Sequence, residues 1–197
     1  MAAKTLLLHV CCGPCAMMPI TRLQSLGYEL TAWFMNPNIQ PLAEYLRRRE
    51  AAGICAYHFG IPIIYEDATW NITTWLRAVR DQDEPPKRCQ YCCEMRIKAA
   101  FRKAEELGFD CVTSSLLYSI YQPHEVIKAC GEREAQNSSV QFVYQDFRID
   151  WQAGIDASTN LGLYRQPYCG CVYSESERYQ KKLRRLISPS NSGPKKD

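Results

Sequence analysis

Residues 4–15 read KTLLLHVCCGPC, an apolar run that ends in three closely spaced cysteines. The segment 4–10 is apolar almost throughout, which is typical of a strand buried on both faces of a parallel sheet. A helix is predicted directly after it, over residues 15–28, with Gly27 as its C-terminal stop. A buried strand followed at once by a helix predicts the first unit of an α/β sheet. The cysteines between them should lie at the carboxyl edge of the sheet, where such folds bind ligands.

The same alternation continues along the chain, and it predicts right-handed crossovers in a mostly parallel sheet with helices on both faces. We therefore expect a doubly wound, Rossmann-like α/β fold in a single domain over residues 1–187. Residues 188–197 have the composition of a disordered tail. The further strands are expected at 29–36, 61–67, 109–117 and 140–147, and the further helices at 41–60, 71–81, 89–108, 124–137, 154–162 and 174–186.

The composition is that of an ordinary globular protein: 197 residues, of which 46% are hydrophobic and 23% charged. No apolar run approaches the roughly 18 residues that a membrane helix needs. The N-terminal segment lacks the pattern of a signal peptide, so a cytoplasmic location is expected. The formal net charge of +3 neither requires nor excludes a nucleic-acid partner.

The chain contains eleven cysteines, and most of them fall into three groups at the ends of predicted elements. In a cytoplasmic protein, such groups indicate metal binding or redox catalysis more often than structural disulfides. The groups are Cys11, Cys12 and Cys15; Cys89 and Cys92; and Cys169 and Cys171.

The spacing within these groups has chemical consequences. Cys89 and Cys92 should lie on one side of a helix start, as the ligand pairs of iron–sulfur and zinc sites do, and the helix N-terminus should lower their pKa. Gly13 would let the backbone approach a bulky cluster closely. Cys169 and Cys171 are one residue apart, so a disulfide between them would be strained and oxidising.

Structural zinc and plain packing are the simpler interpretations of these cysteines. At least six clustered thiols exceed what one closed zinc site uses, and no histidine has the spacing of a zinc finger. No glycine-rich phosphate loop follows the first strand. The remaining thiols, together with one histidine, are expected to be core residues: Cys55, Cys93, Cys111, Cys130 and His9.

Six segments together resemble the cobalamin-independent epoxyqueuosine reductase family, from about His9 to Ser174. The resemblance implies an adenine-nucleotide hydrolase-like Rossmann fold. It also implies reduction of epoxyqueuosine to queuosine at the tRNA wobble position, by two-electron removal of the epoxide oxygen. The segments are HVCCGPC, NPNIQPLAEYLRRRE, RCQYCCEMRI, TSSLL, DFR and LGLYRQPYCGCVYS.

The resemblance also implies a [4Fe–4S] cluster, whose ligands by motif are Cys11, Cys12, Cys89 and Cys92. In one view of the family, the remaining pair is redox-active and acts in catalysis. In another view, some of these thiols hold an additional mononuclear iron. The residues concerned are Cys15, Cys169 and Cys171.

The expected proton donor is Tyr168, which adjoins Cys169; Asp146 and Arg165 are further candidates. The expected partners are tRNA carrying epoxyqueuosine and an external low-potential electron donor. Basic residues that could bind tRNA phosphates are Arg47, Arg48, Arg49, Lys87 and Arg88.

Two other functions fit parts of the pattern. A tRNA thiolase-like modification enzyme combines this fold with cysteines, but it would need ATP and a phosphate loop after the first strand. A non-catalytic iron–sulfur or zinc-binding protein would hold metal without changing epoxyqueuosine-containing tRNA.

Overall fold

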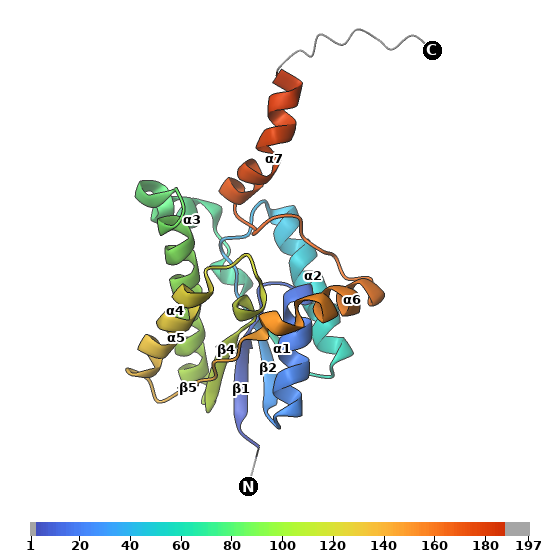
Figure 1. Ribbon diagram of the computed structural model, residues 1–197. Helices are drawn as coiled ribbons and strands as arrows, with labels where there is room; N and C mark the ends of the chain where they lie inside the picture. The colour runs from blue at the N-terminus through green and yellow to red at the C-terminus, as the bar shows by residue number, and fades with distance from the viewer. Residues whose placement is uncertain (1–2, 188–197) are drawn as a thin grey trace.

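Five parallel strands form one sheet in the order β3-β2-β1-β4-β5 (Figure 1). The structure, a computed structural model, describes residues 3–187, so the expected tail at 188–197 lies outside the described residues. The predicted parallel α/β architecture is confirmed. The strands are β1 (Thr5–His9), β2 (Glu29–Phe34), β3 (Ile63–Tyr65), β4 (Cys111–Ser114) and β5 (Gln141–Phe142).

Helices cover both faces of the sheet (Figure 1). On one side α1 packs against α2 and α6, and on the other α4 packs against α5. No described helix is both long and apolar enough to cross a membrane. The helices are α1 (Gly13–Ser25), α2 (Leu42–His58), α3 (Ile72–Val79), α4 (Lys87–Leu107), α5 (His124–Ala135), α6 (Trp151–Asn160) and α7 (Val172–Ile187).

The centre of the sheet explains the apolar run with which the sequence begins. Leu6, Leu7 and Leu8 are fully buried, because β1 lies between β2 and β4 and is covered on both faces. His9 at the end of β1 is also fully buried. Its Nδ1 lies 2.8 Å from the Ser114 hydroxyl and its Nε2 lies 3.1 Å from the Met35 carbonyl. The prediction of a hydrogen-bonded core histidine is therefore confirmed.

The strand order reverses between β1 and β4, and this reversal positions the site. From β1 the chain proceeds outward to β2 and β3, then crosses back to β4 on the other side of β1. The loops that follow β1 and β4 therefore diverge at the carboxyl edge and leave a crevice there. Cys11 follows β1, and a short 3₁₀ helix, η3 (Ser115–Tyr118), follows β4. The Cys11 amide donates to the Ser115 hydroxyl across this crevice, at 3.0 Å.

Gly13 permits a close contact between two helices. A Cβ at this position would lie 2.3 Å from the carbonyl oxygen of Ala51, so only a glycine lets α1 approach α2 this closely. The facing side of α2 is accordingly built from small side chains, which include Ala51, Ala52 and Cys55.

Candidate metal centre

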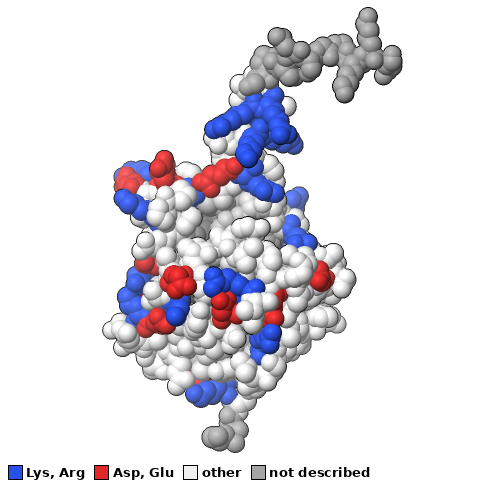
Figure 2. All heavy atoms as spheres, in the orientation of Figure 1, with Lys and Arg blue, Asp and Glu red and all other residues white. Residues whose placement is uncertain are grey.

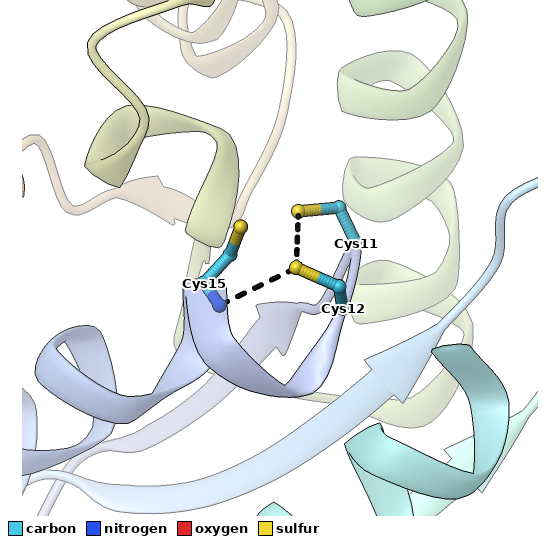
Figure 3. A group of neighbouring side chains, drawn as sticks. All are labelled: Cys11, Cys12 and Cys15. Atoms are coloured by element: carbon cyan, nitrogen blue, oxygen red, sulfur yellow. Dashed lines mark hydrogen bonds between the residues drawn. The ribbon is translucent and has the colours of Figure 1, made fainter. Parts of the chain in front are cut away.

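Three thiols converge at the carboxyl end of β1 (Figure 3). The Sγ atoms of Cys11, Cys12 and Cys15 all lie within 4.8 Å of one another, and the first two are 3.8 Å apart. Cys12 is the N-cap of α1, since its sulfur accepts the Cys15 amide hydrogen at 3.3 Å. Two thiolates bound to one tetrahedral ion at about 2.3 Å lie about 3.8 Å apart. The three thiols, called the triad below, thus have the spacing of metal ligands.

The three thiols of the triad differ in acidity. Hydrogen bonding with Cys12 and Cys15 holds the pKa of Cys11 well below its usual value. Burial raises the pKa of Cys12, and the hydrogen bond to Cys11 raises that of Cys15. Of the three thiols, Cys11 is thus the one that loses its proton most readily, and a bound metal would displace the protons of the other two.

Two polar side chains outside the triad contact its sulfurs. The Ser115 hydroxyl donates to Cys11 Sγ at 3.3 Å, and Gln166 Nε2 donates to Cys12 Sγ at 2.8 Å. Such contacts orient metal ligands and tune their basicity. Sequence reasoning missed both residues. The signal that could have identified them is their position in two segments that carry the family resemblance, TSSLL and LGLYRQPYCGC.

The other two cysteine groups meet around a second pocket. Cys89 and Cys92 stand at the start of α4, and Cys169 and Cys171 lie in the loop before α7. All four line the same pocket; Cys169 is exposed, while Cys92 and Cys171 are buried. The structure thus brings these two sequence groups together.

Burial reverses the expected acidity of the α4 thiols. It raises the pKa of Cys89, and it raises that of Cys92 to about 12. The expectation that the helix N-terminus lowers their pKa is therefore wrong, because desolvation of the thiolate is the larger effect here. A bound metal cation would displace these protons.

Three buried polar atoms on the wall of the second pocket lack a hydrogen-bond partner among the described residues. They are Asn38 Oδ1, Trp75 Nε1 and Arg88 Nε. Two of the three are N–H donors, and the sulfurs of an anionic cluster are acceptors for such donors. Buried donors are rarely left unpaired in the functional state of a protein, so this wall fits an anionic metal cluster.

Arg96 of α4 connects the two thiol groups electrostatically. Its side chain is buried, and the described residues contain no carboxylate that pairs with it. Burial lowers the pKa of this guanidinium, but nearby thiols raise it by more, so it remains charged. A buried cation needs a compensating negative charge. The nearby thiols that would provide it once deprotonated are Cys92, Cys93, Cys169 and Cys11.

The expected cluster ligands are divided between the two groups. Cys11 and Cys12 belong to the triad, while Cys89 and Cys92 line the second pocket. Within residues 3–187, the triad is the one set of three thiols, histidines or carboxylates at single-ion spacing.

The structure also places the four thiols expected in the core and the expected proton donor. Cys55, Cys93, Cys111 and Cys130 are buried, as expected of core thiols. The hydroxyl of Tyr168 donates to the Gln40 carbonyl at 3.0 Å.

Two of the arginines expected to bind phosphate are buried instead. Arg48 forms a 2.7 Å ion pair with Glu44 and donates to the Cys169 carbonyl at 2.7 Å. Arg88 pairs with Glu177 of α7 at 2.7 Å. Sequence alone could not separate these two from their exposed neighbours, because both lie in continuous basic runs.

Comparison with known proteins identifies a family and several relatives of this chain. The sequence profile of the family described as Epoxyqueuosine reductase QueH matches residues 6–177. The Epoxyqueuosine reductase QueH of Thermotoga maritima is 36% identical, over 90% of this chain and 93% of its own length. The protein of the same name from Histophilus somni is 39% identical, over 86% of this chain and 71% of its own.

A solved structure shares the fold. It is the U34-tRNA thiolase NcsA from Methanococcus maripaludis with its [4Fe-4S] cluster, which aligns with a TM-score of 0.52 over 94% of this chain and 68% of its own. Only 14% of the aligned residues are identical, so the likeness extends to the Rossmann-like fold alone. The profile match spans β1 to the start of α7 and includes all three cysteine groups. The chain belongs to the epoxyqueuosine reductase QueH family.

Proposed function

We propose that this chain reduces epoxyqueuosine to queuosine in tRNA. The observation that carries the proposal is membership of the epoxyqueuosine reductase family over nearly the whole described chain, together with a thiol triad at the sheet's switch point. The reaction breaks both C–O bonds of the epoxide and forms a C=C bond. It consumes two electrons and two protons and releases water.

The cofactor that we propose is a [4Fe–4S] cluster held by Cys11, Cys12, Cys89 and Cys92. Its support is the converging triad, the unpaired donors of the second pocket and the uncompensated charge of Arg96. When bound, such a cluster supplies electrons one at a time. An additional mononuclear iron has no separate observation in its support.

Cys169 and Cys171 can supply the reducing equivalents in one step. Oxidation of two thiols to a disulfide releases two electrons and two protons, which is what epoxide reduction consumes. Both side chains line the second pocket, and Cys169 is exposed to an external reductant. We propose that a low-potential electron donor restores this pair after each turnover.

Tyr168 is proposed here to position the Cys169 loop and remains a candidate proton donor. Its hydroxyl hydrogen is engaged by the Gln40 carbonyl, and the Arg48 guanidinium lies 5.4 Å from its ring centroid. Proton donation to substrate would require the hydroxyl to leave that carbonyl.

The tRNA surface that we propose includes α7. This helix extends away from the body of the protein, and Lys and Arg side chains gather on it (Figures 1 and 2). Exposed cationic side chains at this spacing suit contacts with RNA phosphates. The exposed basic residues of α7 are Arg178, Lys181, Lys182, Arg184 and Arg185.

The thiolase-like and non-catalytic alternatives are not favoured. The segment after β1 is CCGPC, which has neither the glycines nor the lysine of a phosphate loop. Turnover without ATP distinguishes a reductase from a thiolase, and formation of queuosine distinguishes it from a passive metal protein.

A series of single Cys→Ser variants tests the proposed roles. The anaerobically prepared protein is assayed for iron, acid-labile sulfide and conversion of epoxyqueuosine tRNA. Cys11→Ser and Cys92→Ser should lose iron and activity together, whereas Cys171→Ser should retain iron and lose activity.

Cys55→Ser and Cys130→Ser are matched controls, because both thiols are buried and their sulfurs contact Met17 and Arg133 rather than a cysteine of the three groups. They should lower stability and leave the iron content per folded chain unchanged. Full activity in Cys92→Ser would contradict the proposed ligand set.

A further inference from the structure

A cavity outside the thiol groups adjoins the triad through Cys15. It has a volume of about 80 Å³, is partly open to solvent, and lies between the start of α1, η3, α6 and the loop before Cys169. We call it the α6 cavity; the lining residues used below are Cys15, Tyr118, Trp151, Ile155, Arg165 and Gln166.

The position of the α6 cavity is one that α/β folds use for ligands. Cys15 stands in the first turn after β1, and Tyr118 ends the η3 segment that follows β4. The cavity thus opens beside the crevice between the strands where the order reverses, and α6 forms its outer wall.

Two aromatic side chains give the cavity a rigid apolar wall. The rings of Tyr118 and Trp151 are 5.2 Å apart with an interplanar angle of 32°. The Tyr118 hydroxyl donates to the Trp151 carbonyl at 2.8 Å, which fixes its ring. A Cβ on Gly154 would lie 2.2 Å from that hydroxyl, so the glycine is what lets α6 approach. Such a wall suits a flat ring system.

Gln166 provides the polar end of the cavity. Its Nε2 lies 2.8 Å from Cys12 Sγ and 3.6 Å from Cys15 Sγ. The amide nitrogen is thus the atom that faces the two sulfurs, and the amide oxygen faces away from them. That oxygen, Oε1, is buried and has no partner among the described residues. A buried acceptor without a partner is unfavourable, and a ligand with an O–H or N–H group would supply the missing hydrogen bond.

Arg165 adds a positive charge to the wall. Its side chain is exposed, and it donates to the Thr159 hydroxyl at 3.2 Å. A guanidinium in this position can pair with a phosphate next to a bound nucleoside.

We propose that the α6 cavity receives the modified nucleoside itself, extruded from the tRNA, with its hydroxylated five-membered ring at the triad end. In this arrangement Gln166 Oε1 accepts a hydroxyl hydrogen of that ring, the aromatic wall contacts the flat base, and Arg165 pairs with the adjacent phosphate. The assignment rests on the proposed reductase function and adds to it the place where the substrate binds. Extrusion is the usual way in which enzymes reach an atom of a base in a folded nucleic acid.

The experiment measures kcat/KM for epoxyqueuosine tRNA with the anaerobic holoprotein and three variants. Ile155→Trp fills the cavity and should lower kcat/KM at least tenfold without changing the iron content. Ala153→Trp is the matched control, because it adds the same side chain to an exposed position of α6 and should leave kcat/KM unchanged. Arg165→Gln should raise KM several-fold with little change in kcat.

The outcomes separate the cavity from the function. Suppose that the wild-type protein converts the tRNA, that Ile155→Trp has the wild-type kcat/KM, and that Arg165→Gln has the wild-type KM. This result would overturn the cavity assignment and leave the reductase function intact. No conversion by iron-loaded wild-type protein would overturn the function itself. If Ile155→Trp fails to fold, Arg165→Gln decides, because an exposed side chain can be replaced without disturbing the core.

Discussion

Arg48 and Arg47 are neighbours in sequence with opposite environments. The side chain of Arg48 is 2% exposed and that of its partner Glu44 is 6% exposed, whereas Arg47 is exposed. Arg48 also donates to the carbonyls of Tyr168 and Cys169, at 3.0 and 2.7 Å. It therefore holds the loop that carries the CxC pair against α2.

Replacing Arg48 should accordingly be costly. Arg48→Ala leaves the Glu44 carboxylate buried without its cation, so we expect a loss of about 3–5 kcal/mol in the free energy of unfolding. Arg47→Ala, an exposed change, should stay within about 0.5 kcal/mol of wild type. Urea unfolding of the two variants measures this, and equal effects would contradict the structural role of Arg48.

Arg96 should influence the electron affinity of the metal centre. A positive charge beside a cluster favours uptake of an electron, so Arg96→Leu should make the reduction potential more negative, while Arg96→Lys should stay closer to wild type. Arg102→Leu, at an exposed position of the same helix, is the control. A potential titration of the anaerobic protein provides the readout. An unchanged potential in Arg96→Leu would show that the guanidinium does not sense the cluster.

At the residue scale, the sequence predicted the thiols better than their surroundings. Cys11, Cys12 and Cys15 converge because their spacing spans the end of a strand and the first turn of a helix, which is a local property. Gln166 is 151 positions from Cys15 along the chain, and nothing local indicates that it meets the triad. Likewise, the sequence does not distinguish Arg96 from the other charged residues of its amphipathic helix.

The contact between α1 and α2 depends on Gly13. A methyl group there would overlap the Ala51 carbonyl at 2.3 Å and separate the two helices. We expect Gly13→Ala to destabilise the protein by about 1–3 kcal/mol through overpacking.

Gly27→Ala is the comparison for Gly13→Ala. Gly27 has a φ of +82° and open space around it, so its substitution strains the backbone without a clash. We expect a cost of about 1 kcal/mol there. Thermal unfolding and the iron content of both variants are measured together. Gly13→Ala should also disturb the metal centre, since its neighbours are the triad, and retention of iron with wild-type stability would contradict this account.

At the element scale, the order and type of the main helices and strands follow from periodicity, but side-chain exposure does not. Leu42 and Leu46 of α2 lie at helical spacing with Tyr45, yet they are 47% and 51% exposed, whereas Tyr45 is buried. The small residues of α2 occupy the interface because Gly13 brings α1 close. The expected strand at 140–147 is reduced to Gln141–Phe142, since β5 is an edge strand that pairs with β4 alone.

For the whole molecule, charge on α7 should determine how tRNA binding responds to salt. Arg184→Gln with Arg185→Gln should weaken tRNA binding. It should also make the slope of log K against log salt shallower by about 0.7–0.9 for each phosphate that the variant no longer neutralises. Arg102→Gln with Lys128→Gln, at positions on α4 and α5, is the control pair. An unchanged slope in the α7 variant would exclude this helix from the tRNA surface.

The central claim is that the thiol groups around one sheet edge support removal of the epoxide oxygen. The most direct measurement is mass spectrometry of nucleosides released from epoxyqueuosine tRNA after incubation with the anaerobic, iron-loaded protein and a low-potential reductant, without ATP. We expect epoxyqueuosine to disappear and queuosine to appear in equal amount. Unaltered epoxyqueuosine after treatment with iron- and sulfide-replete protein would contradict it.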